Sequence, residues 1–157
     1  MLKAIKNKIM VQPIIKEITV NASIKKVWKA ISNKEDLAKW FHQSDDYKLE
    51  VGHTFHMTGH HEGKDYPHTM TITEIIPEKK IGLEWFIEGD CGITQVTYEL
   101  KADGEKTLVK VTHSGFDKYA GGEENRNDYN NGWEHVLNTL LKDYLENDKE
   151  RENQSCE

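Results

Sequence analysis

Two tryptophan-bearing amphipathic segments, one near each end of the chain, enclose a long stretch in which apolar and polar residues alternate. The first segment runs from Ala22 to Ile31 and the second from Gly132 to Leu141. Alternation with a period of two predicts β-strands, whereas apolar residues three and four positions apart predict helices. A series of strands closed by one long helix tends to enclose a cavity, so the pattern favours a binding protein over a catalyst.

The alternating stretch predicts antiparallel strands joined by tight turns. A first strand is predicted at Ile14–Val20, ahead of the first amphipathic segment. Turn-like separators such as Gly63-Lys64-Asp65 and Ala102-Asp103-Gly104-Glu105 favour hairpins over strand–helix–strand units. The later strands are predicted at Tyr47–Val51, Thr54–His60, Thr69–Ile76, Ile81–Ile87, Thr94–Leu100 and Thr107–His113.

Helices are predicted before and after these strands. Ile24, Val27, Trp28 and Ile31 lie at helical spacing, and a second short helix carries Leu37, Trp40 and Phe41. Each strand has one apolar face, and such a sheet needs a cover. The long amphipathic segment that can supply it carries Trp133, Val136, Leu137, Leu140, Leu141, Tyr144 and Leu145. On this arrangement Trp85 and Trp133 meet across the interior, where they either fill it or leave an aromatic-walled slot for a planar ligand.

Length and charge bound the class of protein. A chain of 157 residues favours one domain, here predicted at residues 14–146, with an N-terminal extension at 1–13 and a polar tail at 147–157. The net charge of −6 argues against nucleic acid and against anionic membranes as partners. The N-terminal residues contain no apolar run long enough for a signal peptide or a membrane span. Cys91 and Cys156 lie too far apart to suggest a disulfide, so we expect a cytoplasmic protein.

Six separate pieces of the sequence form an ordered set. They are Ala22…Val27-Trp28-Lys29-Ala30-Ile31, Leu37…Trp40-Phe41, Val51-Gly52…Phe55, Thr73-Glu74-Ile75-Ile76-Pro77, Thr107…Val111-Thr112-His113-Ser114-Gly115-Phe116 and Gly132-Trp133…Leu137…Leu140. Together they resemble the heat-shock-protein-90 ATPase activator homologue-like family, within the START-like (SRPBCC, birch-pollen-allergen-like) superfamily. The resemblance extends from about Ile15 to Tyr144 and implies an α+β helix-grip fold. This fold has a curved antiparallel sheet of six to seven strands around a long C-terminal helix, with two short helices after the first strand.

The resemblance also implies a hydrophobic cavity between the sheet and the last helix, used in the superfamily for lipids, sterols, flavonoids and polyketides. We expect a small apolar or aromatic ligand there and no cofactor. Phe116 and Tyr119 are predicted at the entrance, on a Gly-rich segment that is either a lid or a plain connector. The expected ligand contacts are Phe55, Met70, Trp85, Tyr98, Val111, His113, Trp133 and Leu137.

Two alternatives remain open for function. One is a chaperone-associated interaction module, and the other is a cyclase-like enzyme that uses His113; no catalytic residue is assigned. His113 continues the apolar face of its strand, so it is predicted to point inward. There it either contacts a ligand or is a core histidine bonded to Tyr98 or a backbone carbonyl.

The histidines at His53, His56, His60, His61 and His68 raise the question of a metal site. His56, His60 and His68 could converge as a trio if their two strands pair. No carboxylate or cysteine completes a recognisable motif, and Phe55 and Met57 occupy the apolar face of the strand. We therefore expect these histidines on the solvent face and predict no metal site.

Overall fold

The protein is described by a computed structural model that covers residues 12–41, 44–61, 63–87, 93–116 and 122–146. Six antiparallel strands form one sheet in the order β1-β6-β5-β4-β3-β2. The elements are β1 (Ile14–Val20), α2 (Ile24–Ser32), α3 (Lys34–Trp40), β2 (Thr54–His61), β3 (Lys64–Ile76), β4 (Lys80–Ile87), β5 (Thr94–Asp103), β6 (Lys106–Ser114), α4 (Gly122–His135) and the π-helical segment η2 (Val136–Leu141).

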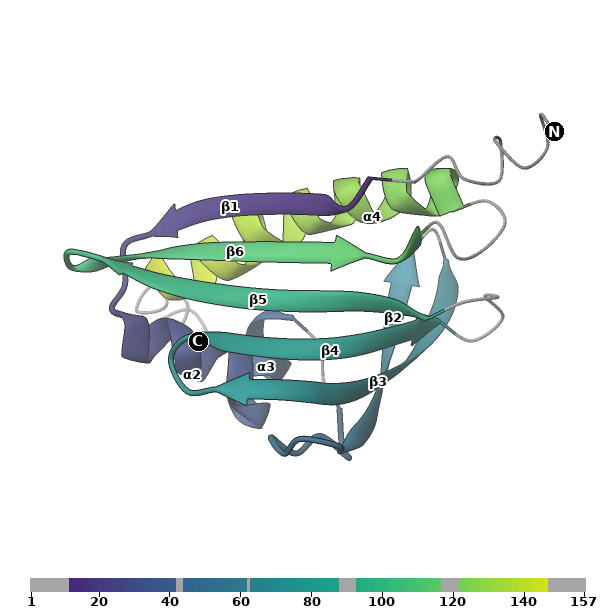
Figure 1. Cartoon of the computed structure of the whole chain (residues 1–157), viewed down its shortest axis with the longest axis horizontal. Helices are drawn as coiled ribbons and strands as arrows, with labels where there is room; N and C mark the ends of the chain where they lie inside the picture. The colour runs from purple at the N-terminus through teal and green to yellow at the C-terminus, as the bar shows by residue number, and fades with distance from the viewer. Residues whose placement is uncertain (1–11, 42–43, 62, 88–92, 117–121, 147–157) are drawn as a thin grey trace, which may run out of the picture.

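The sheet is strongly curved, and helices cover its concave face. Helix α4 crosses behind β1 and β6, and α3 lies behind β4 and β3 (Figure 1), while α2 contacts β5 and β6. This arrangement confirms the predicted α+β helix-grip fold. None of the helices in the described ranges is long and apolar enough to cross a membrane.

The alternation in the sequence specifies which side chains face the helices. Val96, Tyr98 and Leu100 of β5 are buried, and so are Val109 and Val111 of β6. The register brings these residues together, because Tyr98 pairs with Val111 and Leu100 with Val109. The strand predictions from Thr54 onward are confirmed, although β3 begins earlier than predicted, at Lys64.

The strand predicted at Tyr47–Val51 is wrong. This segment is irregular, with turn hydrogen bonds from Tyr47 N to Ser44 O and from His53 N to Glu50 O. Leu49 and Val51 are 38% and 57% exposed, so their alternation with Tyr47 does not mark a buried face. A three-residue alternation is too short to distinguish a strand from a loop with one inward-pointing side chain.

The last helix contains a π-helical turn that aligns its buried side chains. Trp133, Leu137, Leu141 and Leu145 are all at most 3% exposed and lie four residues apart. In a regular α-helix each such step turns the stripe by about 40°. A bond from Lys142 N to Leu137 O closes a wider turn, which offsets this drift. The stripe therefore stays directed at the sheet.

Hydrogen bonds fix the two short helices to their surroundings. Ser23 and Asn33 cap α2 and α3 by accepting from Lys26 N and Asp36 N. Trp40 Nε1 donates to Ala30 O at 2.8 Å, which joins α3 to α2. Tyr144 Oη donates to Asp36 Oδ2 at 2.9 Å, which joins α3 to the last helix. These hydrogen bonds hold the α2–α3 pair in place, so that the pair forms a fixed part of the wall of the interior.

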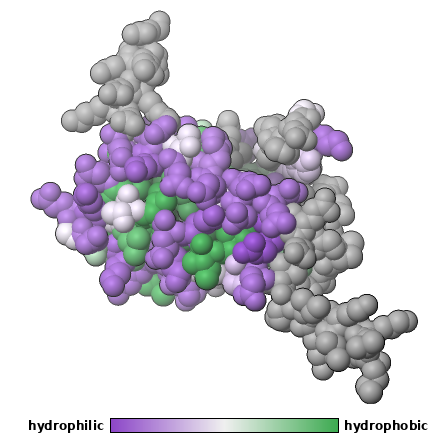
Figure 2. Space-filling view, turned by 90° about the horizontal axis from the view of Figure 1, so that it is seen from above, coloured by the Kyte–Doolittle hydropathy of each residue, from purple (hydrophilic) through white to green (hydrophobic). Residues whose placement is uncertain are grey.

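The face that carries β1 and α4 is largely hydrophilic. Figure 2 views the molecule from that side and shows hydrophobic residues only in small separate patches among the described residues. This face therefore offers an apolar ligand no extensive apolar surface among the described residues.

Candidate ligand-binding site

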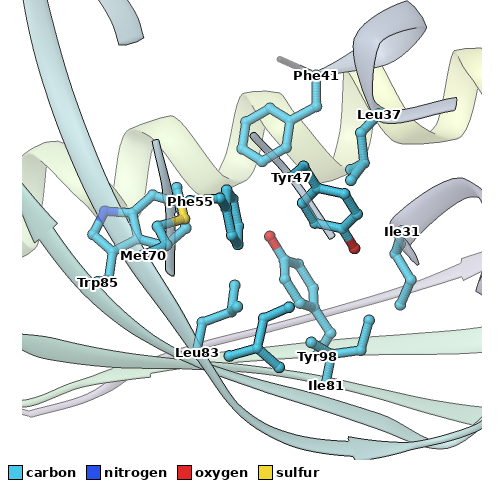
Figure 3. A pocket seen from close by; sticks show the side chains of 11 residues that line it. Ile31, Leu37, Phe41, Tyr47, Phe55, Met70, Ile81, Leu83, Trp85 and Tyr98 are labelled. Atoms are coloured by element: carbon cyan, nitrogen blue, oxygen red, sulfur yellow. The ribbon is translucent and has the colours of Figure 1, made fainter. Parts of the chain in front are cut away.

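A small cavity lies between the sheet and the α2–α3 pair. Its volume is about 20 Å³, enough for about one water molecule. Figure 3 shows aromatic rings converging on it from the sheet and from the segment after α3. The lining residues are Ile31, Leu37, Phe41, Tyr47, Phe55, Met70, Ile72, Ile81, Leu83, Trp85 and Tyr98.

The Tyr98 hydroxyl is a buried polar group in the apolar lining of this cavity. Its side chain rises from β5 with the hydroxyl directed at the cavity centre (Figure 3), and the residue is only 6% exposed. Within the described part of the chain, its hydroxyl has no hydrogen-bond partner. Burial, and then the neighbouring Tyr47, raise the pKa of Tyr98, so the group is a neutral donor. A buried hydroxyl without a hydrogen-bond partner costs free energy until it donates a hydrogen bond to an acceptor.

Phe41 and Tyr47 close the cavity opposite the sheet. Both are partly buried, and Tyr47 packs edge-on against Phe55 with ring centroids 4.9 Å apart. The Tyr47 hydroxyl donates to Ser32 O at 2.7 Å, and burial raises its pKa to about 12. These two rings are contributed by the chain between α3 and β2, whereas most of the remaining wall belongs to the sheet.

Asp46 fixes the segment that carries Tyr47. Its carboxylate accepts hydrogen bonds from the His56 side chain at 2.7 Å and from His56 N at 2.9 Å. Ser44 Oγ donates to the same carboxylate at 2.9 Å. The His56 side-chain bond, followed by the His56 backbone bond, holds the pKa of Asp46 well below its usual range. The Asp46 and His56 side chains are 49% and 62% exposed, so these contacts lie at the surface and join the segment to the edge strand β2.

His113 lies outside the cavity, in a chain of buried hydrogen bonds. Trp133 Nε1 donates to His113 Nδ1 at 3.0 Å, so the proton of the neutral ring is on Nε2. Nε2 then donates to Thr94 Oγ1 at 2.7 Å, and the Thr94 hydroxyl donates to Trp85 O at 3.2 Å. Burial, and then His68, lower the pKa of His113 to about 3. Both ring nitrogens are used within the fold, so we assign His113 no role with a ligand.

The structure separates the predicted contact residues into two groups. Phe55, Met70, Trp85 and Tyr98 line the cavity. Tyr119 is outside the described residues. The others are at most 3% exposed and form the core next to it: Val111, His113, Phe116, Trp133 and Leu137.

The cavity does not lie where it was predicted. None of its lining residues in the described chain belongs to the last helix. Trp133 packs directly against Trp85, with ring centroids 5.7 Å apart, and against Tyr98 at 5.9 Å. The two tryptophans meet as predicted, and their direct contact between sheet and helix favours the alternative in which the rings fill this space.

The structure contradicts one of the histidine predictions and leaves two of the residues outside its description. His68 is 7% exposed and packs edge-on against Trp85, so the prediction that it faces solvent is wrong. It shares the inner face with Met70 because the two are two residues apart on β3. The side chains of His60 and His61 are outside the described residues. Among the described residues no three histidine, cysteine or acidic side chains are grouped as metal ligands.

Several lining residues were missed by the sequence analysis. Ile72 and Leu83 follow from strand alternation, since each is two residues from a predicted contact residue. Leu37 and Phe41 were recognised as apolar helix residues, but nothing local indicates that α3 faces β3 and β4. Tyr47 was not predicted to line the cavity, because the segment Tyr47–Val51 was predicted to be a strand.

Comparison with known proteins identifies the family. The sequence model described as "Activator of Hsp90 ATPase homolog 1-like protein" matches residues 21–146. The chain belongs to this family. The match begins just before α2 and ends with the last helical residue described, so this activator-homologue domain contains every lining residue of the cavity. No curated protein matches the sequence.

Solved structures agree on the fold. Protein BH1534 of Bacillus halodurans is 29% identical, with a TM-score of 0.68, and the match covers 87% of this chain and 99% of that chain. The Aha1 dimer of Colwellia psychrerythraea is 24% identical, with a TM-score of 0.65, covering 86% and 96% of the two chains. DynU16, from the dynemicin biosynthetic locus, is 19% identical, with a TM-score of 0.72, covering 85% of this chain and 47% of its own. The activator-homologue domain thus spans about half of DynU16.

Proposed function

We propose that this activator-homologue domain binds a small, largely apolar molecule that carries one hydrogen-bond acceptor. The site is the interior between β3–β5 and the α2–α3 pair. The observation that supports this most directly is the Tyr98 hydroxyl, which is buried, has no hydrogen-bond partner among the described residues and is aimed into an aromatic-lined cavity. Aromatic walls with one oriented polar group are typical of small-molecule sites.

Water is a poor occupant of this cavity. A buried water needs two to four polar partners, and the lining offers hydroxyls only from Tyr47 and Tyr98. The Tyr47 hydroxyl already donates to Ser32 O. A ligand with an apolar body and a single carbonyl or ether oxygen satisfies Tyr98 and buries apolar surface at the same time.

Binding requires the interior to open. Ligand pockets usually measure about 300 Å³ or more, whereas this cavity measures about 20 Å³. Phe41 and Tyr47 belong to the chain between α3 and β2, so their displacement requires no change in the sheet or in the body of either short helix. We infer that the ligand replaces these two rings against Phe55 and Tyr98.

Tyr98→Phe tests the unpartnered hydroxyl. Without ligand, the variant is expected to be as stable as the wild type or about 1 kcal/mol more stable, because no hydrogen bond is lost and a buried polar group is removed. Tyr47→Phe is the matched control: it removes a hydroxyl that donates to Ser32 O, and is expected to lose about 1 kcal/mol. Urea unfolding measures both. Equal losses in the two variants would show that Tyr98 has a partner after all.

The same variant tests ligand binding. Acetylnaphthalene carries a carbonyl and ethylnaphthalene does not, and both are otherwise alike. We expect the wild type to prefer acetylnaphthalene by about fivefold and Tyr98→Phe to lose that preference. Titration followed by tryptophan fluorescence gives both dissociation constants. Failure of the wild type to bind either molecule, or any hydrophobic compound in native mass spectrometry, would contradict the proposed function.

The family match supports a second candidate, association with heat-shock protein 90. The matching family is described as activators of that chaperone's ATPase. We expect a stimulated rate of ATP hydrolysis when the domain is added to the purified chaperone. An unchanged rate together with no complex in size-exclusion chromatography would exclude this candidate and leave ligand binding unaffected.

A further inference from the structure

A groove on the outside of the molecule shares one wall with the internal cavity. The groove has a volume of about 350 Å³ and lies along α2, the start of α3 and the segment after Ser44. Tyr47 lines both the groove and the cavity. The side chain of Tyr47 therefore separates a space large enough for a small molecule from the interior site proposed above.

The groove is cationic although the chain is acidic. Lys29, Lys34 and Lys48 line it together with one acidic residue, Glu35, while the whole chain has a net charge of −6. Trp28 adds a partly buried aromatic ring to the same lining. A concave surface of this kind attracts an anion that also has apolar surface to bury.

The three ammonium groups differ in how firmly they are held. Lys48 Nζ is 3.6 Å from Glu50 Oε2, and both side chains are more than half exposed, so that pair is weak. Lys29 Nζ is 3.9 Å from Asp36 Oδ1, at the limit of an ion pair. Lys34 has no carboxylate partner among the described residues.

Lys34 instead holds the segment that carries Tyr47. Its ammonium donates to the backbone carbonyl of Asp45 at 2.7 Å, two residues before Tyr47. A hydrogen bond from an ammonium to a carboxylate or sulfonate is stronger than one to a neutral carbonyl. An anionic group in the groove therefore competes with Asp45 for Lys34 and loosens the segment that blocks the cavity.

We propose that the groove binds the anionic head of an amphiphilic ligand whose apolar body passes Tyr47 into the interior. The head, a carboxylate or a sulfonate, lies among Lys29, Lys34 and Lys48, and the body reaches Phe55 and Tyr98. This inference rests on the proposed function and narrows it to singly charged anionic amphiphiles. Binding of the head and opening of the cavity are coupled through the Lys34 contact to Asp45.

A pair of fluorescent probes tests the proposal. Anilinonaphthalene sulfonate and phenylnaphthylamine share their aromatic rings, but only the first has a negative charge. We expect the wild type to bind the sulfonate about tenfold more tightly than the neutral probe. This preference is expected to shrink severalfold between about 0.05 M and about 0.5 M salt, because exposed charges are screened.

The variant is Lys29→Gln/Lys34→Gln/Lys48→Gln, and its control is Lys64→Gln/Lys101→Gln/Lys106→Gln. The control changes the net charge equally at exposed lysines outside the groove. The groove variant is expected to bind both probes alike, while the control keeps the preference. Circular dichroism in the aromatic region verifies that each variant is folded. Lys34→Gln alone is expected to lose at least half of the preference for the sulfonate probe over the neutral probe.

The possible outcomes separate this proposal from the proposed function. Equal binding of the two probes by the wild type, or a preference that survives in the groove variant, overturns the groove proposal and leaves interior binding intact. If the wild type binds neither probe, both proposals are wrong.

Discussion

Acidification from pH 6.5 to pH 4 is expected to reduce the free energy of unfolding by about 3 kcal/mol through His113 alone. Burial lowers the pKa of His113 to about 3 in the folded protein, from an ordinary value of 6.5. Between these values the unfolded chain binds a proton that the folded protein does not. The stabilisation is therefore complete above pH 6.5 and is lost as the pH falls towards 3.

The prediction is tested by urea unfolding at several pH values between 4 and 7. His113→Gln removes the titrating group, so its stability is expected to fall with acidity much less steeply, by about 1.4 kcal/mol less per pH unit. His135→Gln, at an exposed position of α4, is expected to keep the wild-type slope. Asp46 does not interfere in this range, because its stabilising effect is lost only below its ordinary pKa of 3.8. Identical slopes for His113→Gln and the wild type would show that His113 is not held neutral.

Trp133→Ala is expected to lower the free energy of unfolding by about 4 kcal/mol. Trp133 is 3% exposed and packs against Trp85, Tyr98 and His113 at once. Its removal leaves a large void between sheet and helix. It also takes away the donor to His113 Nδ1, which leaves a buried acceptor without a partner.

Urea unfolding measures this loss against two further variants. Trp133→Phe keeps most of the ring volume and loses the indole N–H, so it is expected to cost about 2 kcal/mol. Trp28→Ala is the control for tryptophan removal, since Trp28 lies on the partly exposed side of α2 and is expected to cost much less. A similar loss in Trp28→Ala and Trp133→Ala would contradict a central role for the Trp85–Trp133 contact.

Much of the fold was predictable from the sequence because it depends on local patterns. The alternation in β5 and β6 assigned Tyr98, Val111 and His113 to the inner face, and all three are buried there. The spacing of Trp133 and Leu137 likewise predicted the buried stripe of the last helix. These features follow from the periods of strands and helices, which are read within a few residues.

The position of the cavity was not predictable in this way. The apolar faces of the sheet and of three helices must all be buried against one another. The sequence does not indicate which helix leaves a cavity between itself and the sheet. Trp133 and Trp85 pack against each other under the last helix, whereas the cavity lies under α2 and α3. His68 was misplaced for a related reason, because its polarity was given more weight than its register with Met70.

The sequence by itself determined the strands, the helices and the inward face of most of them, because each of these depends on the chemistry of near neighbours. Tertiary structure alone decided that both nitrogens of His113 are occupied and that Tyr47 lies between cavity and groove. It also decided that the Tyr98 hydroxyl has no hydrogen-bond partner in the described part of the chain. These properties depend on distances between residues far apart in the chain: His113 is 19 positions from Thr94 and 20 from Trp133. Such distances are set by how large side chains pack, and packing is a property of the whole interior.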